Sequence, residues 1–371
     1  IMMISKKENC FGNGLYIQLP RFRNPIPLFI VFRALGIISD KDICNYILLN
    51  CEKTENKQYL KFLQASIIDA NKYLTKEEAF QEMVNNVMYT PINMDKETGS
   101  RKKYDFTIEV IETDLFPHCS KKEEKLFFMG YMANQLILRY FGVYDEDERD
   151  SYINKRLDTT GVLLNNLFRN YFNKFVKDMQ KQIRKEIKTG SWRSNQDFKN
   201  IINYTNIYKI IKSSTIENGI KRSLATGDFG IKNTNSNKVG VAQVLNRLTY
   251  IASLSHLRRV NTPIEKNGKL VQPRKLHSTI WGFICPAETP EGASVGVVKN
   301  LSFLTHITIE SSSKPIFEIL KGKYEPLDNF TKDPTKIYQK SKLIVNGNWI
   351  GLIENPIELY NFVKSDLTSV N

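Results

Sequence analysis

Two long stretches of apolar residues at helical spacing are the strongest constraint on how this chain folds. In residues 121–141 and again in residues 158–188, apolar side chains recur at three- and four-residue steps, which is the spacing of one face of an α-helix. The first stretch ends at Gly142 and the second at Gly190, and the last turns before Gly190 are basic, as the helix dipole prefers. The sequence therefore predicts two long amphipathic helices that each need a partner surface.

Shorter patterns predict the structure of the N-terminal part. Residues 15–19 are predicted to form a strand, and Ser39, followed by acidic residues, is predicted to start a helix. Residues 58–90 continue with helical character, and the polar segment 93–103 is predicted to be a loop.

The pattern changes after Ile216. Helical periodicity gives way to glycines, prolines, hydroxyls and basic residues, which is typical of exposed loops on a rigid frame. After about residue 305, the alternating runs 307–309 and 343–345 predict short strands, and Asn346-Gly347 predicts a tight turn. The predicted class is therefore α+β with more than one domain.

The charge of the chain favours a polyanionic partner. The 371 residues carry 53 Lys and Arg against 39 Asp and Glu, a formal net charge of +14. Such an excess attracts nucleic acid, because each phosphate that is neutralised releases counterions. The alternative is that an AT-rich genome inflates Lys, Asn and Ile without any functional meaning. Charge by itself leaves both explanations open.

No segment predicts a membrane partner. The best apolar stretch, Pro25–Ile38, is interrupted by Arg33 and is shorter than a spanning helix requires. The chain begins with Ile1 and lacks the layout of a signal peptide, so we expect it to start inside a longer protein.

The cysteines and histidines argue against a metal or disulfide framework. Five cysteines, none in a C-x-x-C pair, predict reduced thiols in an intracellular protein. A metal or nuclease site built from His256, His277, Cys285 and Glu288 is the alternative. The two histidines are not at a helical ligand offset from each other, and the flanks of these residues are proline and glycine turns, so we expect no metal on this chain.

Residues 222–310 concentrate the donors that recognise nucleic acid. This segment holds eleven Lys and Arg against five acidic residues, and the basic residues come in pairs beside turns. Arg can clamp a phosphate through two hydrogen bonds, while Gln, Asn and Ser can bond sugars or base edges. A polar helix with an ordinary solvated face would show a similar pattern, so the composition leaves that alternative open.

Five runs in this segment resemble one protein family. Residues 224–230, 240–247 and 255–259 resemble the fork region of the second-largest, beta-type subunit of multisubunit DNA-directed RNA polymerases of the eukaryotic, archaeal and large-DNA-virus type. Residues 261–274 resemble its fork loop, and residues 276–301, with Cys-Pro-Ala-Glu-Thr-Pro-Glu-Gly, resemble its most recognisable signature. So many runs in the same order make this resemblance far more specific than a short motif.

The resemblance extends over most of the chain. Pro25–Asp42 resembles the lobe of that subunit, Asp150–Gly161 the return into its protrusion, and Val345–Gly351 its first external domain. It implies a fragment that covers the lobe, part of the protrusion, the fork and the first external domain. Asp228-Phe229 and Glu265-Lys266-Asn267 depart from the usual pattern and suggest a divergent, viral or eukaryotic, member.

The resemblance also implies a division into domains. We expect a helix-rich, lobe-like domain at 1–150 and a helical return into the protrusion at 151–222. A loop-rich, fork-like region that faces nucleic acid is expected at 223–304, and a small external-1-like α+β module at 305–371.

The resemblance implies a set of residues that face nucleic acid or nucleotide. They are Gln243, Arg247, His256, Arg258, Arg259, Lys269, Arg274, His277, Glu291, Lys155 and Arg156. Gln243 and Arg259 are expected to face the RNA–DNA hybrid or the wall beside it. Lys155 and Arg156 are expected to contact the nucleic-acid backbone, with an ordinary solvated surface as the alternative.

Arg274 and Glu291 carry a more specific expectation. The resemblance implies that Arg274 lies near the incoming nucleotide or the RNA end, with Glu291 across from it. The alternative is that the two residues form a purely structural ion pair.

The resemblance implies no catalytic residue on this chain. In the family, Mg²⁺ is held by the largest subunit in an Asn-Ala-Asp-Phe-Asp-Gly-Asp motif, and this sequence contains nothing similar. The chain alone is therefore not expected to polymerise RNA. The implied partners are the largest and other polymerase subunits, the DNA template, nascent RNA and ribonucleoside triphosphates.

Two alternatives remain open from the sequence. The chain is expected to be a polymerase subunit in DNA-templated transcription, and the competing hypothesis is a free-standing nucleic-acid-binding or regulatory protein derived from such a subunit. The implied compartment is the nucleus for a cellular enzyme, and a cytoplasmic viral factory or the virion for a viral one.

Overall fold

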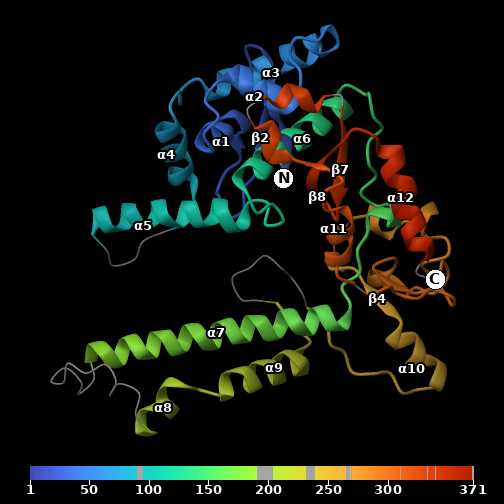
Figure 1. Cartoon of the computed structure of the whole chain (residues 1–371). Coiled ribbons are helices and arrows are strands. Elements are labelled where there is room, and N and C mark those ends of the chain that lie inside the picture. The colour runs from blue at the N-terminus through green and yellow to red at the C-terminus, as the bar shows by residue number, and fades with distance from the viewer. Residues whose placement is uncertain are drawn as a thin grey trace. The chain divides into compact units, whose positions relative to one another are not determined.

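The computed structural model describes residues 1–89, 95–189, 204–230, 239–264, 268, 270–309, 311–331, 333–338 and 340–369. The chain divides into two compact units (Figure 1). Unit 1 combines residues 1–146 with 310–371, and unit 2 is residues 147–309. The two ends of the chain therefore belong to the same unit, and the finer division into four domains stays a prediction.

Unit 1 opens with a small antiparallel sheet. Its three strands, in the order β1-β2-β3, are β1 (Met2–Asn9), β2 (Gly12–Ile17) and β3 (Ile26–Pro27). Leu15 and Ile17 of β2 are buried, which confirms the predicted strand in its first part.

Six helices of unit 1 follow along the chain. They are α1 (Leu28–Ala34), α2 (Asp40–Leu48), α3 (Lys57–Ala70), α4 (Lys76–Asn86), α5 (Lys96–Glu109) and α6 (Lys122–Tyr140). Ser39 caps α2 as predicted, because its Oγ accepts a hydrogen bond from the Asp42 N–H at 3.4 Å. The predicted long helix at 121–141 is confirmed by α6, which is followed by Gly142 at a φ of +71°.

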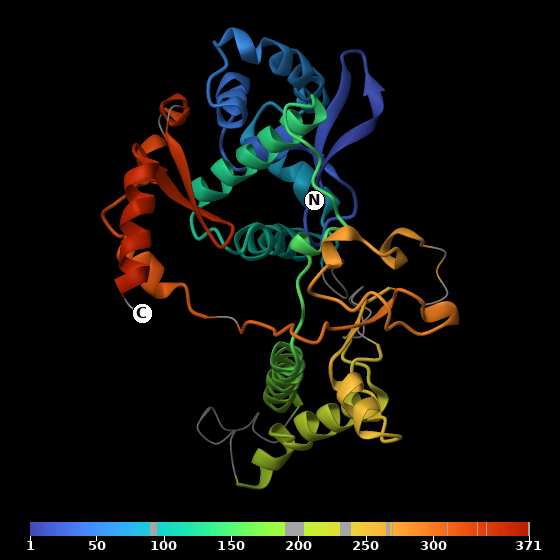
Figure 2. The same ribbon diagram turned by 90° about the vertical axis from the view of Figure 1, so that its right-hand side faces the viewer.

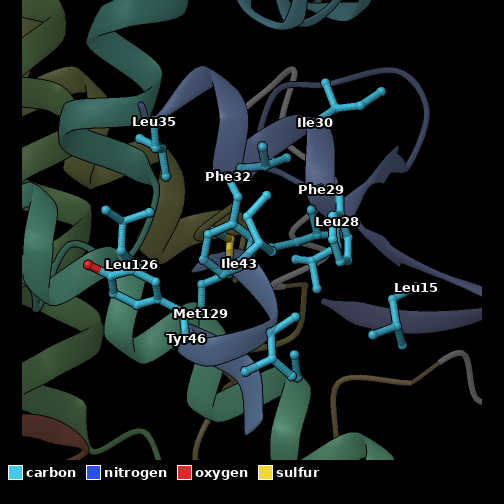
Figure 3. Packing of buried hydrophobic residues seen from close by; sticks show 14 of the residues in the cluster. Leu15, Leu28, Phe29, Ile30, Phe32, Leu35, Ile43, Tyr46, Leu126 and Met129 are labelled. Carbon is cyan, nitrogen blue, oxygen red and sulfur yellow. The ribbon is translucent and has the colours of Figure 1, made fainter. Parts of the chain in front are cut away.

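The core of unit 1 surrounds α1, whose seven residues are all buried (Figure 3). Tyr46 of α2 packs against Phe127 of α6 with ring centroids 4.8 Å apart. Gly130 lets the two helices approach, because a Cβ at this position would clash with the Tyr46 carbonyl. The buried Arg33 donates to the carbonyls of Ala70 and Tyr73, both at 2.7 Å, and pairs with an Asp40 oxygen at 2.6 Å.

The predicted loop at 93–103 is wrong where the structure describes it, because α5 begins at Lys96. Only Gly99 and Thr107 of this helix are buried, so the sequence lacks the apolar stripe that reveals an amphipathic helix. Tertiary contacts hold α5 instead: Tyr104 packs on Phe80, and Phe106 stacks on Tyr89.

The C-terminal part of unit 1 is a small α+β arrangement. Its elements are α11 (Lys314–Leu320), β6 (Glu325–Pro326), β7 (Ser341–Val345), β8 (Asn348–Ile353) and α12 (Pro356–Ser369), with the strands in the order β6-β8-β7. Asn346 and Gly347 make the predicted turn with φ of +49° and +80°. Trp349 packs against Phe127 and Tyr131 of α6, so these strands share the core of the N-terminal helices.

The predicted strand at 307–309 is wrong, because these residues are in no strand of the described structure. Alternation of apolar and polar residues forms a strand only where a neighbouring strand supplies hydrogen-bond partners. None of the described strands pairs with this run.

Unit 2 contains the second predicted long helix. Its elements are α7 (Thr160–Thr189), α8 (Tyr204–Ile210), α9 (Ser214–Thr226), α10 (Tyr250–Leu257), β4 (Arg259–Asn261) and β5 (Val298–Asn300). Figures 1 and 2 show α9 alongside α7. Gly219 of α9 lies against the ring of Tyr171, whose hydroxyl is 3.2 Å from the Ser223 Oγ.

Helix α9 extends ten residues beyond Ile216, where the sequence predicted that helical structure gives way to loops. The helix ends at Gly227, which has a φ of +69°. Between Gly227 and Ile309, the described residues lie mostly in loops and single turns, apart from α10, β4 and β5.

Single helical turns complete both units. They are Thr54–Asn56, Val110–Asp114, Tyr152–Asn154, Gln272–Arg274, Ser278–Ile280, Gly292–Ser294, Leu327–Phe330 and Pro334–Ile337. None of the helices that the structure describes is both long and apolar enough to cross a bilayer. The α+β fold with more than one compact part is confirmed.

Candidate nucleic-acid interface

Three segments of unit 2 meet around the two-stranded sheet β4–β5. Arg259 pairs with Asn300, and Asn261 pairs with Val298. The Asn300 carbonyl also accepts a hydrogen bond from the Cys285 N–H at 2.8 Å. The basic pair at 258–259 and the proline- and glycine-rich signature run therefore converge on one frame.

A cleft of about 1580 Å³ opens beside this sheet, and residues of unit 2 alone line it. The lining contains six Lys and Arg residues: Arg149, Lys155, Arg156, Arg259, Lys275 and Lys299. It contains three acidic residues: Asp150, Asp158 and Glu288. The cleft is therefore positively charged, and such a cleft concentrates anions.

Six of the eleven predicted site residues line this cleft. They are Lys155, Arg156, Gln243, His256, Arg259 and His277. Arg247, Arg258, Arg274 and Glu291 are not part of its lining, and Lys269 lies outside the described residues.

His256 fixes the segment that precedes α10. Its Nδ1 accepts a hydrogen bond from the Asn246 N–H at 3.0 Å, so the ring proton is on Nε2 and is donated to Gln243 Oε1, also at 3.0 Å. Gln243 Nε2 in turn donates to the Gly240 carbonyl at 2.9 Å. Gln243 is thereby held in a defined orientation while its side chain remains exposed.

His277 organises another part of the cleft lining. Its Nε2 lies 2.8 Å from a carboxylate oxygen of Glu148, and its Nδ1 accepts from the Thr279 N–H at 3.2 Å. The hydroxyl of Thr279 accepts from the Tyr152 N–H at 2.9 Å. The ring thus joins the signature run to the segment that carries Lys155 and Arg156.

Two arginines direct their donors to main-chain carbonyls. Arg258 Nη2 donates to the carbonyls of Ser302 at 2.5 Å and Phe303 at 3.2 Å. Arg274 Nη1 donates to the carbonyls of Ala293 at 2.6 Å and Val295 at 2.9 Å. Both arginines therefore brace loops in this conformation.

Gly296 is needed beside Arg274. A Cβ at position 296 would clash with the main chain of Arg274, and Gly296 has a φ of +68°. Glu291 is exposed one turn away, before the short helix Gly292–Ser294. The expected placement of Arg274 and Glu291 at a nucleotide stays a prediction.

The remaining predicted basic residues are solvent-exposed. Arg259 projects from β4, Arg247 lies before α10, and Lys155 and Arg156 follow the short helix Tyr152–Asn154. Lys155 Nζ is 3.8 Å from an Asp150 oxygen. A loose pair of this kind is worth little in water, so Lys155 remains available to an anion in the cleft.

Lys299 is a cleft residue that the sequence did not predict. This lysine of β5 is partly buried in the cleft wall, and its Nζ donates to Thr262 Oγ1 and to the Pro273 carbonyl, both at 3.3 Å. Burial lowers the pKa of Lys299, the positive charge of Lys155 lowers it further, and Asp150 opposes both effects. The sequence offered one indication of a role for Lys299, its position inside the signature run 276–301. That it lies near Lys155 follows only from the fold.

Three of the four residues of the alternative metal site make other side-chain contacts. The rings of His256 and His277 bond Gln243 and Glu148, and Glu288 accepts a hydrogen bond from the Ser255 hydroxyl. Across the described residues, no three His, Cys, Asp or Glu side chains gather so that they could hold a metal ion.

Comparison with known proteins places this cleft in a family. The profile described as RNA polymerase Rpb2, domain 3 matches residues 243–307, and that of RNA polymerase Rpb2, domain 2 matches residues 3–158. The first match contains β4, β5 and most of the cleft lining.

Whole-chain comparisons agree with the two profiles. The chain is 38% identical to DNA-directed RNA polymerase II subunit 2 of Arabidopsis thaliana over 95% of its own length and 28% of the relative's. It is 33% identical to DNA-directed RNA polymerase subunit 2 of Acanthamoeba polyphaga mimivirus, over 95% of this chain and 30% of the relative. The match to subunit Rpo2N of Methanococcus vannielii is 32% identical over 83% of this chain and 57% of the relative. The chain spans less than a third of the length of the eukaryotic relatives, and it belongs to the family of second-largest subunits of DNA-directed RNA polymerases.

Proposed function

We propose that this chain forms the nucleic-acid-facing wall of the second-largest subunit in a DNA-directed RNA polymerase. The observation that carries the proposal is the positively charged cleft of unit 2, and most of its lining lies in the region matched by Rpb2, domain 3. In this role the chain shapes the path of DNA and of the RNA–DNA hybrid during transcription.

The cleft residues divide this work by their chemistry. Arg259, Lys155 and Arg156 neutralise backbone phosphates, because their charged ends are exposed at the cleft. Gln243, oriented by His256, offers amide groups to a sugar or base edge. Arg274 and Glu291 stand beside the incoming nucleotide or the RNA end in this proposal.

The polymerisation chemistry belongs to the assembled enzyme. Two Mg²⁺ ions stabilise the attacking and leaving oxygens in nucleotide transfer. The residues described here form no ligand cluster for them, so we propose that the largest subunit holds the metal and that this chain supplies walls and phosphate contacts. Its other partners are the remaining polymerase subunits, template DNA, nascent RNA and ribonucleoside triphosphates. It acts in the nucleus in a cellular enzyme, and in a viral factory or virion in a viral one.

The decisive experiment is affinity purification of the tagged native protein with mass spectrometry of the proteins that accompany it. We expect a stoichiometric partner that carries the aspartate-rich metal motif, and DNA-templated RNA synthesis by the purified complex. Recovery of the protein alone, with salt-dependent binding to single strands, would contradict the subunit proposal and favour a free-standing nucleic-acid-binding protein.

A further inference from the structure

Lys299 is a cation held by neutral groups. Its Nζ donates to the hydroxyl of Thr262 and to the carbonyl of Pro273, and an ammonium group has three hydrogens to donate. No carboxylate in the described part of the chain lies within ion-pairing distance of Lys299. These two contacts use two of the three hydrogens, and Lys299 belongs to the lining of the cleft.

A second lysine acts on the same point of the wall. Lys155 lines the same cleft, and its positive charge lowers the pKa of Lys299 in addition to the larger effect of burial. Asp150 compensates weakly, since it lies 3.8 Å from Lys155 Nζ and both of these side chains are partly exposed. Two like charges beside a partly dehydrated wall are unfavourable in an empty cleft, and an anion between them removes that cost.

The position of Lys299 is fixed by the fold. Strand pairing places its neighbours Val298 and Asn300 opposite Asn261 and Arg259. Thr262 follows β4 and Pro273 lies in the short helix Gln272–Arg274, so Lys299 is anchored to both of these segments. A preorganised ammonium group of this kind loses little side-chain freedom when it binds an anion.

We propose that Lys299 and Lys155 form a subsite that binds one phosphate group in the cleft. The proposal rests on the function proposed above and names the ligand of one point of the cleft. The phosphate belongs to a nucleic-acid backbone or to a ribonucleoside triphosphate, and the compact ammonium groups bind it as point charges.

The test uses the assembled polymerase on a scaffold of template DNA annealed to a short RNA. Lys299→Gln retains amide donors for Thr262 and Pro273 but loses the charge. We expect the slope of log affinity against log salt concentration to fall by about 0.7 to 0.9, the change for one lost phosphate contact. Lys299→Arg keeps the charge and should preserve the slope. A purely structural role of Lys299 would not predict that the slope follows the charge of this side chain.

A double variant tests whether the two lysines share one phosphate. Lys155→Gln should lower the slope like Lys299→Gln, and the double variant should lose little more than the larger single loss. Additive losses would overturn the shared subsite. Lys41→Gln is the matched control, because Lys41 is an exposed lysine of unit 1 that pairs with Glu52, and it should leave the slope unchanged.

The salt slope and the KM for ribonucleoside triphosphates together show where the phosphate comes from and whether the subsite exists. A lower salt slope identifies a backbone phosphate, whereas a several-fold higher KM for ribonucleoside triphosphates with an unchanged slope identifies the nucleotide. If Lys299→Gln changes neither quantity while the wild-type enzyme keeps its steep salt dependence, the subsite is refuted and the function proposed above stands. A wild-type enzyme without salt dependence would refute the basic cleft itself, and the subsite with it.

Discussion

His256 and Gln243 are joined by a hydrogen bond of 3.0 Å between the imidazole Nε2 and the amide Oε1. The same ring accepts the Asn246 N–H through Nδ1. One histidine of α10 thereby fixes both the side chain that faces the cleft and the main chain that leads to it.

Replacing His256 should loosen this segment without unfolding unit 2. His256→Ala removes the hydrogen bond of the Asn246 N–H, worth about 1 kcal/mol, so the Asn246 amide should exchange its hydrogen roughly fivefold faster. Hydrogen exchange with mass spectrometry measures this change. His118→Ala in unit 1 is the control, and unchanged exchange at Asn246 in the His256 variant would show that the ring does not hold the segment.

Much of the fold was predictable from local sequence, because the determining interactions are local. The apolar spacing of 121–141 and 158–188 predicted α6 and α7, Ser39 predicted the start of α2, and Asn346-Gly347 predicted the turn between β7 and β8. In each case the signal lies within a few residues of the structure that it specifies.

The sequence failed where structure depends on distant partners. Helix α5 has no apolar stripe and is held by contacts of Tyr104 and Phe106 with rings elsewhere in unit 1. In the cleft, basic composition predicted exposed cations such as Arg259. It did not predict that Lys299 would be half buried beside Lys155, because residues 144 positions apart meet only through tertiary structure.

The close contact of α2 and α6 predicts that replacing two different glycines by alanine changes stability very differently. Gly130→Ala should destabilise unit 1 by about 1–3 kcal/mol, because the new methyl group meets the Tyr46 carbonyl and the helices must move apart. Gly161, in the first turn of α7, faces open space, so Gly161→Ala should be neutral or stabilise by up to about 1 kcal/mol.

Trp349 fluorescence during urea unfolding measures the first of these effects. Trp349 is buried against Phe127 and Tyr131 of α6, and replacing the other two tryptophans by Phe makes it the sole reporter. The Gly161 variant is the control, since it lies in unit 2 and should leave the Trp349 transition in place. An unchanged midpoint for Gly130→Ala would mean that the helices are not in tight contact.

Tyr46 predicts how unit 1 responds to alkaline pH. Burial, then the charges of Asp42 and Glu123, raise the pKa of Tyr46 from 10.0 to about 12. The folded unit thus keeps a proton that the unfolded chain releases above pH 10. The stability that Tyr46 contributes is complete below pH 10, is lost as the pH rises from 10 to 12, and stays lost above that.

Tyr46→Phe tests this linkage. At pH 9 the variant should be less stable by about 1 kcal/mol, because the hydrogen bond of 3.3 Å to the Thr331 carbonyl is lost. Between pH 10 and 12 the stability of the variant should fall less steeply than that of the wild type. The two slopes should differ by at most about 1.4 kcal/mol per pH unit. Urea unfolding midpoints of the wild type and the variant, measured across this pH range, test the prediction. If both midpoints depend on pH in the same way, Tyr46 does not titrate as its burial implies.

Arg258 is expected to support the cleft wall through the main chain. Arg258→Met removes donors from the carbonyls of Ser302 and Phe303, so the amides of residues 302–305 should exchange roughly tenfold faster, as expected for about 1–2 kcal/mol of lost hydrogen bonding. The salt dependence of nucleic-acid binding by the assembled enzyme should stay the same. A lower salt slope with unchanged exchange would instead assign Arg258 to a phosphate.

Arg259 and Arg274 should both slow elongation, but for different reasons. Arg259 is exposed at the cleft, so Arg259→Ala in the assembled polymerase should reduce the salt slope by about 1 and leave hydrogen exchange around the cleft unchanged. Arg274 braces Ala293 and Val295, so Arg274→Ala should slow elongation and also accelerate exchange in residues 292–296. Single-nucleotide addition rates combined with hydrogen exchange separate the two effects. Normal elongation by both variants would remove these arginines from the proposed interface, because a cleft wall that contacts the hybrid cannot lose a cation or a brace without affecting movement along the template.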